Sequence, residues 1–459
     1  MMKQRPALST ECFSGARDYG YIIAIIDSII RSLHLKRVLI MRIMNKTLIA
    51  ATLTSLLALT YAQADTTLYG TIGFEYQSKK FASDAPTYDN GKGTFSRERL
   101  SNIGTADHEF GIRGTESLGG DTSVIYNLEW KFHADDDNYQ DGLTTHVAYL
   151  GLTGNWGTIK VGRQDNPFKV MLVDSTVNDD FNGSDVISSA AESAMTTALG
   201  GIGITMSNNN NTYNGFDATH ITFNGQNPTI TVNSEAENYF DGTTISYTDY
   251  SHFGHTLSYT TPDFAGFQAN AAIMMNAALY PENNKKGIDL WTINAQYGID
   301  AGDGQILAQA GYIQGHLVDR DKSKVWGAFL GYLSDQWNVT ASYADGNYHK
   351  APTAITTAQG VTSEISNKAK SKGWDLGASF SFGANYDNTI RASYGQNQVK
   401  QFGAKDKVKS WAIGYQNNLS SRTTAWVEYG VSKTTFNKQF NNLEAQKNSV
   451  VSIGLSHDF

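Results

Sequence analysis

Short segments in which apolar and polar residues alternate follow one another along most of the chain. In the clearest one, residues 124–132, the apolar face holds Val124, Tyr126, Leu128, Trp130 and Phe132, and the polar face holds Asn127, Glu129 and Lys131. A period of two residues is typical of a β-strand with one apolar and one polar face. Residues 68–76 and 450–459 repeat the pattern, so we expect an all-β chain.

Short turns and long loops connect these segments in alternation. Glycine-rich turns such as 119–120 and 154–157 are tight, whereas a polar loop is expected to run from the first strand to about Asn102. This alternation is typical of outer-membrane barrels. Counting the segments predicts an antiparallel barrel of about 16 strands, a size that leaves an aqueous channel.

The polarity of the two faces favours a barrel that spans a membrane. The proposed outward faces are apolar and aromatic, whereas the inward faces carry Glu, Lys, Arg, Asn and Gln. In lipid every backbone polar group must be paired within the protein, so only a closed sheet can present such a surface. The predicted fold is therefore a transmembrane antiparallel β-barrel.

Residues 164–251 interrupt the strand pattern and form an 88-residue insert after the fifth predicted strand. Between Asp165 and Tyr250 there are eleven acidic side chains and one basic side chain, Lys169. A long segment without clear secondary structure is uncommon in a compact domain unless it has a function. We interpret the strands as a scaffold that holds this acidic insert.

The N-terminal region predicts export. Residues 44–64 combine a positive start at Lys46, a short apolar run and the small residues Ala62 and Ala64, which together are typical of a cleaved signal peptide. Cleavage is expected after Ala64. Residues 1–43 fit no signal pattern and are interpreted as an upstream over-extension of the gene model.

The composition of residues 65–459 narrows the possible partners. This part carries 28 basic and 41 acidic side chains, and a net negative charge without a basic cluster argues against nucleic acid. The only cysteine, Cys12, lies before the predicted cleavage site, so a disulfide or a cysteine metal site is not expected.

Five motifs in order resemble the general porins of Gram-negative outer membranes. They lie at 111–120 (GIRGTESLGG), 149–152 (YLGL), 157–164 (GTIKVGRQ), 257–267 (LSYTTPDFAGF) and 454–459 (GLSHDF). The resemblance covers essentially all of 65–459. It implies a homotrimer of 16-stranded barrels in outer-membrane lipid and lipopolysaccharide, each with a water-filled pore, and a terminal Phe459 that is read by the barrel-assembly machinery.

The resemblance also implies that the loop after Arg163 folds into the barrel and sets acidic residues against basic wall residues. Arg113 and Arg163 match basic positions of the family, whereas Glu109 and His252 stand where relatives often have arginine. The predicted pore-lining set is Arg113, Lys131, Lys160, Arg163, Glu109, Glu129, Asp174, Asp179, Asp180 and Asp185. Residues 164 to about 193 are expected to narrow the pore. Weak strand signals occur later in the insert, at 220–223 and 229–232.

One residue of this set conflicts with simple alternation. If Lys160 points into the lumen, Arg163 points outward. Arg163 reaches the lumen only if the strand bulges or bends, and Gly162 is the residue that would permit it.

These observations predict an outer-membrane porin for passive diffusion of ions and small hydrophilic solutes, with weak cation selectivity from the acidic insert. Two alternatives remain open. The insert could instead form a sugar or organic-acid site in a substrate-specific channel. An enzyme of the outer membrane would need a group such as His146 with a loop aspartate, and nothing else in the sequence supports that class.

No cofactor or metal site is predicted. The ten histidines show no metal-ligand spacing, and Asp135–Asp137 and Asp179–Asp180 lack the spacing of an EF-hand calcium loop. Solvated acidic loops explain both aspartate runs.

Overall fold

The structure, a computed structural model, describes residues 64–83, 87–89, 92–132, 143–200, 204–208, 211–215, 220–224, 227–231, 252–275, 287–315, 323–348, 353–356, 362–365, 369–401, 404–436 and 443–459. The predicted signal peptide up to residue 63, the over-extension at 1–43 and the aspartates at 135–137 lie outside these residues. So does most of the insert after residue 200.

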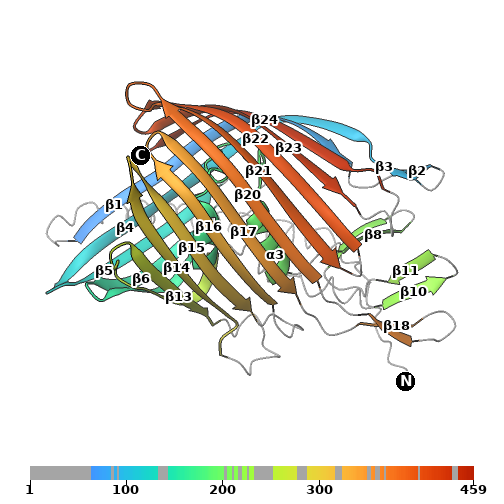
Figure 1. Cartoon of the computed structure of the whole chain (residues 1–459), viewed down its shortest axis with the longest axis horizontal. Helices are drawn as coiled ribbons and strands as arrows, with labels where there is room; N and C mark the ends of the chain where they lie inside the picture. The colour runs from blue at the N-terminus through green and yellow to red at the C-terminus, as the bar shows by residue number, and fades with distance from the viewer. Residues whose placement is uncertain are drawn as a thin grey trace, which may run out of the picture. The chain divides into compact units, whose positions relative to one another are not determined.

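Sixteen antiparallel strands of the described chain close into a barrel (Figure 1). The first eight in chain order are β1 (Ala64–Ala82), β4 (Arg97–Gly119), β5 (Thr122–Phe132), β6 (Leu143–Gly154), β7 (Gly157–Asp165), β12 (His252–Thr260), β13 (Phe267–Met274) and β14 (Leu290–Ala301). The other eight are β15 (Gly304–Gly315), β16 (Ser323–Ser334), β17 (Trp337–Tyr348), β20 (Ala369–Phe382), β21 (Asn388–Gln401), β22 (Ala404–Ser420), β23 (Thr423–Thr435) and β24 (Gln446–Asp458). Each pairs with the next, and β24 pairs with β1. The predicted fold class is confirmed.

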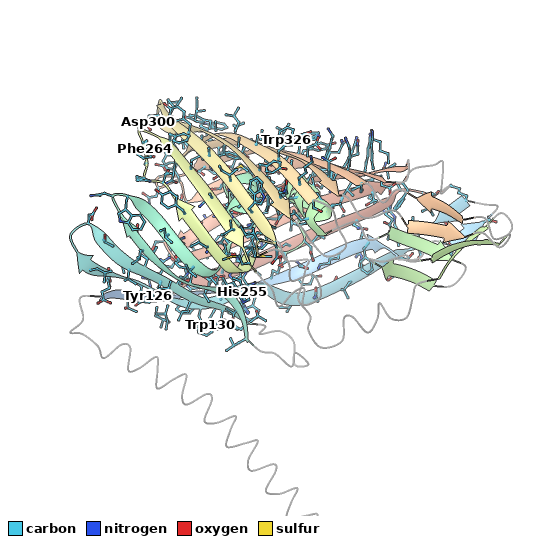
Figure 2. All side chains as sticks on the ribbon, turned by 90° about the horizontal axis from the view of Figure 1, so that it is seen from below. Tyr126, Trp130, His255, Phe264, Asp300 and Trp326 are labelled. Carbon is cyan, nitrogen blue, oxygen red and sulfur yellow. The ribbon has the colours of Figure 1, made fainter. Side chains whose placement is uncertain are left out.

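The barrel's outer face is apolar, as the alternation predicts. Large apolar side chains that stay exposed recur at every second position, as with Ile72, Phe74 and Tyr76 on β1. The aromatic side chains of Tyr126, Trp130 and Trp326 project from the ribbon in the same way (Figure 2). Because this surface has no protein to cover it, it fits hydrocarbon rather than water.

The first strands are longer than the sequence predicts. The expected polar loop up to about Asn102 is partly wrong, because β4 already begins at Arg97 and pairs with β1 from Ala82 onward. Both strands extend beyond the roughly 9–11 residues that a bilayer needs. Outside lipid a strand needs no apolar face, so residues 97–102 gave no alternation signal.

Within the described residues, four short hairpins lie outside the barrel sheet. They are β2 (Thr87–Asp89) with β3 (Lys92–Thr94), β8 (Ile204–Asn208) with β9 (Asn211–Gly215), β10 (His220–Asn224) with β11 (Asn227–Thr231), and β18 (Thr353–Thr356) with β19 (Thr362–Ile365). The weak strand signals at 220–223 and 229–232 are therefore confirmed as β10 and β11.

Three short helices follow the fifth barrel strand, β7. They are α2 (Pro167–Lys169), η1 (Val170–Asp174) and α3 (Ala190–Gly200). The Asn166 side chain accepts the backbone N–H of Phe168 at 3.0 Å, and the Ser189 hydroxyl accepts that of Glu192 at 3.1 Å. Both are N-cap bonds that start a helix where the sequence supplies a short polar side chain. No helix of the described chain is long and apolar enough to cross a bilayer.

The main apolar core lies inside the barrel, between this helical segment and the wall. The segment contributes Phe168, Met171, Leu172, Val173, Ala191, Ala194, Met195, Ala198 and Leu199, and the wall contributes Phe253, Met274, Leu290, Ile313, Val325 and Ala344. The expectation of uniformly polar inward faces is thus wrong on β13 to β17. There the wall faces the helical segment instead of water, and each fully buried large side chain contributes about 1.5–3 kcal/mol.

A substitution by arginine should change the stability of the barrel differently on its outer face and on its inner face. Leu330 on β16 is 56% exposed on the outer face, so Leu330→Arg should lower the free energy of unfolding in lipid vesicles by about 2–4 kcal/mol. The control is Gln309→Arg on the adjacent strand β15, which sits on the opposite, inner face and should change stability far less. Equal losses in urea titrations of the two variants would contradict this assignment of faces.

Candidate functional site

The segment after β7 is held in the lumen by three buried carboxylates of the barrel wall. Glu75 on β1, Asp375 on β20 and Glu428 on β23 are each 2% exposed. Their strand neighbours Phe74, Leu376 and Val427 are exposed on the outer face, so the three carboxylates point inward. We call residues 166–199 the lumen loop.

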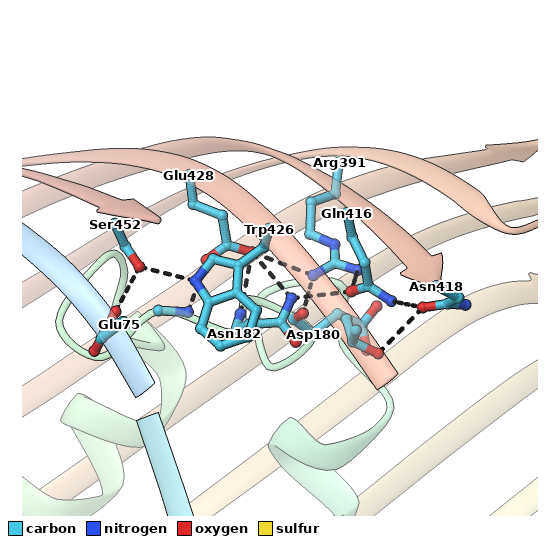
Figure 3. A network of polar contacts seen from close by, with 11 residues as sticks. Glu75, Asp180, Asn182, Arg391, Gln416, Asn418, Trp426, Glu428 and Ser452 are labelled. Carbon is cyan, nitrogen blue, oxygen red and sulfur yellow. Dashed lines mark hydrogen bonds and ion pairs between the residues drawn. The ribbon is translucent and has the colours of Figure 1, made fainter. Parts of the chain in front are cut away.

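Glu428 and Glu75 bind consecutive backbone N–H groups of the lumen loop (Figure 3). The Glu428 carboxylate accepts from Asn182 at 3.1 Å and from Gly183 at 2.8 Å, and Glu75 accepts from Ser184 at 3.0 Å. Hydrogen bonds to an ionised acceptor are about twice as strong as neutral ones. Three adjacent donors of a turn are thereby satisfied without water.

Side chains of the wall complete this network. Ser452 donates to Glu75 at 2.5 Å and accepts from the Trp426 indole N–H at 2.9 Å. Arg391 on β21 donates to the Asp180 carbonyl oxygen and to Gln416 at 2.6 Å, and its guanidinium lies 3.4 Å from Glu428. The buried charge of Glu428 is therefore paired, as a buried ion must be to remain ionised at modest cost.

Asp375 holds the start of α3. It accepts the backbone N–H groups of Ala190 at 2.8 Å and Ala191 at 2.9 Å, and the Ser189 hydroxyl at 2.8 Å. A carboxylate at a helix N-terminus satisfies the otherwise unpaired donors of the first turn and interacts favourably with the helix dipole. The beginning of α3 is thereby attached to the wall.

Two glycines of the wall allow this close approach. A Cβ at Gly373 would overlap the carbonyl group of Ala190, and a Cβ at Gly430 would overlap that of Val186. Backbone meets backbone at both positions, so even alanine would push the lumen loop away from the wall.

The lumen loop brings acidic side chains into the barrel. Of the predicted acids, Asp174 bonds Lys169 at 2.8 Å and Asp185 bonds Lys79 on β1 at 2.5 Å, whereas Asp179 and Asp180 are exposed. Burial acts to lower the pKa of Lys169, but the carboxylates of Asp174, Asp179 and Glu192 together outweigh it and the net shift of the pKa is upward. Lys169 therefore stays charged beside Asp174.

The wall from β4 to β6 carries a second cluster. The Tyr69 hydroxyl donates to Glu129 at 2.6 Å, and the Arg113 guanidinium lies 4.6 Å from the centroid of the Tyr69 ring. Glu129 also contacts the His146 imidazole, and Glu109 lies 3.8 Å from it. The structure thus brings three of the predicted wall residues, Glu109, Glu129 and Arg113, to one face.

The basic residues of the predicted set lie around this cluster. Lys131 is the cross-strand partner of Glu109, and the Lys160 ammonium lies 4.6 Å from the centroid of the Tyr149 ring. His252, predicted near a basic wall position, packs against His146 with ring centroids 3.9 Å apart and the rings tilted by 54°, and it lies 2.9 Å from Asp165.

Arg163 does not sit on a bulge of its own strand. Gly162 has a positive φ of 127°, but the β6–β7 register continues without a shift up to the Ala148–Arg163 pair. The irregularity lies opposite, in β12 between Phe253 and Thr256. The Arg163 Nε donates to the carbonyl oxygens of Thr145 and His146 at 3.1 and 2.9 Å. Its guanidinium is thus attached to the backbone of β6.

Sequence reasoning missed the anchoring residues Asp375, Arg391 and Glu428. Each is a charged residue at an inward position of an alternating strand, as Arg391 is beside the exposed Ile390. That signal is present in the sequence, but it does not distinguish a side chain facing water from one facing the lumen loop.

The end of the chain closes the barrel on itself. Phe459 exchanges backbone hydrogen bonds with Gly70, at 2.9 and 3.3 Å, and its ring is 44% exposed. Ala64, the predicted cleavage residue, is the first residue of β1.

Comparisons with known proteins agree with this architecture. A family model described as Gram-negative porin matches residues 47–437. Over 449 residues the chain is 24% identical to an outer membrane porin protein of Bordetella pertussis, covering 91% of this chain and 100% of that protein. Over 122 residues it is 30% identical to outer membrane porin protein 32 of Delftia acidovorans, covering 26% of this chain and 32% of the relative.

Solved structures share the fold. The anion-selective porin from Comamonas acidovorans superimposes with a TM-score of 0.55 at 17% identity, over 86% of this chain and 100% of that chain. OmpF of Salmonella typhi, solved in complex with daunomycin, gives a TM-score of 0.52 at 14% identity, over 86% and 97%.

Removing the carboxylate of Asp375, which binds the start of α3, should loosen the lumen loop without opening the barrel. Asp375→Asn places an amide donor among backbone donors, which should lower the local stability of the lumen loop by about 1–3 kcal/mol. We expect hydrogen exchange of amides 189–199 to quicken about 10-fold or more while barrel amides keep their protection. The control, Asp345→Asn, removes the 2.6 Å ion pair with Lys372, which does not involve the lumen loop, and should leave the exchange of amides 189–199 unchanged. The same exchange rates in both variants would contradict the anchoring role.

Proposed function

Since the chain belongs to the Gram-negative porin family and is an integral protein of the outer membrane, we propose that its barrel is a passive, weakly cation-selective channel for ions and small hydrophilic solutes. The observation that carries this proposal is the position of the lumen loop. Its backbone bonds inward-facing carboxylates of the wall, so a loop rich in acidic residues lies inside the barrel, where it would face permeating ions.

The charge of the loop favours cations. Residues 164–199 hold six acidic side chains and one basic side chain. Ion pairs with Lys169 and Lys79 offset Asp174 and Asp185. Asp179 and Asp180 are exposed, and the six acidic side chains of this segment still outnumber the nearby basic ones, Lys79, Lys169 and Arg391. Rings or rows of carboxylates in a pore favour cations by raising their local concentration.

The wall opposes this preference only in part. Arg113, Lys131 and Lys160 are set against Glu109 and Glu129, so the acidic and basic side chains define a transverse field across the lumen. Exposed charges are screened over about 8–10 Å at physiological salt. The selectivity is therefore weak, and it is greatest at low ionic strength.

The sign of the preference differs from that named for one structural neighbour. The solved porin from Comamonas acidovorans is described as anion-selective. That neighbour is 17% identical to this chain, so its selectivity does not transfer, and the local balance of charges is the better guide.

Assembly and export complete the proposal. The exposed apolar outer face suits outer-membrane lipid and lipopolysaccharide, and part of it would be covered by two further copies in a homotrimer. Phe459 would be the assembly signal for the barrel-assembly machinery. Residues 44–64 would be a signal peptide cleaved after Ala64, and residues 1–43 would precede the true start of translation. The insert beyond residue 200 would return to the pore mouth or pack against a neighbouring subunit.

Reversal potentials across a salt gradient test the selectivity. The wild-type channel should give a potential of cation-selective sign, and Asp179→Asn with Asp180→Asn should lower the cation-to-anion permeability ratio about 2-fold. The matched control, Asp300→Asn with Asp335→Asn, removes the same charge from the end of β14 and from the turn between β16 and β17, and it should leave the ratio unchanged. A clear chloride preference of the wild-type channel would overturn the proposal.

The same bilayer recording separates the alternatives. A substrate-specific channel would be blocked by its sugar or organic acid at low concentration. An enzyme without a pore would give no ion current.

A further inference from the structure

Three strands bring a carboxylate–imidazole cluster together on the inner wall. Glu109 lies on β4, Glu129 on β5 and His146 on β6. One ligand atom from each, two carboxylate oxygens and the imidazole Nδ1, lie within 4.8 Å of one another. These are the atoms that a single metal ion would bind.

A β-bulge aims His146 at this point. In the β5–β6 pairing Glu129 faces Val147 and Trp130 faces Thr145, so His146 has no cross-strand partner. Strict alternation would turn His146 away from Glu129's face. The bulge returns its ring to that face, and bulges often redirect a side chain next to a functional site.

Neighbouring groups fix the orientation of the cluster. Tyr69 donates to Oε2 of Glu129, which leaves Oε1 directed at His146. The His252 ring packs against that of His146 in a tilted arrangement, and Asp165 in turn contacts His252. Partners that orient a ligand in this way are typical of metal sites and raise their affinity.

We propose that Glu109, Glu129 and His146 bind one divalent first-row transition-metal ion, such as Zn²⁺, on the lumen wall. Imidazole nitrogen with carboxylate oxygen is a donor set that suits these ions, whereas Ca²⁺ and Mg²⁺ prefer oxygen alone. Three protein ligands leave coordination positions for water. The side chains of Glu109 and His146 are 26% and 20% exposed, so an ion can enter from the lumen.

The charges around the site predict a moderate affinity for the metal ion, and they predict that the bound ion changes conduction through the barrel. Lys131 pairs across the strands with Glu109, and Arg113 lies on the same face, so two fixed positive charges oppose the ion. A bound divalent ion adds positive charge to the wall that already carries Arg113, Lys131 and Lys160. It should therefore reduce cation current and weaken the cation preference.

Calorimetric titration of the full-length, untagged protein in detergent with ZnCl₂ tests the site independently of any channel activity. We expect one saturable Zn²⁺ per chain, with affinity about 10-fold or more lower in His146→Gln and in Glu129→Gln. Tyr69→Phe, which removes only the orienting hydroxyl, should also weaken binding about 10-fold. CoCl₂ should give a visible absorption band in the wild-type protein that is lost in His146→Gln.

Controls separate this site from general binding to acidic groups. His457→Gln removes an exposed imidazole that bonds Thr423 on the wall near the chain end, and it should bind Zn²⁺ as the wild type does. CaCl₂ in excess should not displace Zn²⁺. A change in gel mobility on heating shows that each variant is a folded barrel. Glu109→Gln is used in place of any variant that does not show this change. Unchanged Zn²⁺ affinity in folded His146→Gln, or displacement by an equal concentration of Ca²⁺, would overturn the proposal.

Discussion

The structure depends on how backbone N–H groups are satisfied inside an otherwise wet barrel. A loop that enters a lumen loses water on the side that faces the wall, and each unsatisfied donor costs about 1–3 kcal/mol. Glu75, Asp375 and Glu428 accept the N–H groups of five loop residues, Asn182, Gly183, Ser184, Ala190 and Ala191. The acidic residues of this protein thus have two separate uses. Buried ones on the wall hold the loop, and exposed ones on the loop face the path of the permeating ions.

The apolar core inside the barrel supports the same arrangement by a different force. Leu172 and Phe168 pack against Ile313, Val325 and their neighbours, so the lumen loop covers one side of the wall and leaves the opposite side, β4 to β7, facing water. This asymmetry explains where charge collects. The lumen side of β13 to β17 has apolar residues because it is covered, whereas Glu109, Glu129, Arg113 and Lys160 remain on the side that is open.

The barrel could be predicted from the sequence because its signal is local. Period-two alternation at segments such as 124–132 reports directly which face meets lipid, and the five motifs indicated a resemblance to the porins. The lumen loop could be located after β7, but its contacts could not be derived, because Asp375 and Ala190 are 185 residues apart. Polarity alone does not show whether an inward carboxylate meets water or a backbone. For the same reason histidine spacing missed the cluster at His146, whose members come from three strands and depend on one β-bulge.

The turn at Asn182–Ser184 bridges the two ends of the sheet. Its acceptors are Glu75 on the first strand and Glu428 on the strand before the last, and Ser452 of the final strand bonds the same Glu75. Between them runs the seam where β24 pairs with β1. This set of contacts forms only when the first and last strands have paired. The loop therefore connects, from inside the barrel, the strands that close it. A chain whose last strand has not paired with β1 therefore lacks this set of contacts, and its loop is held only by Asp375, Arg391 and the apolar core.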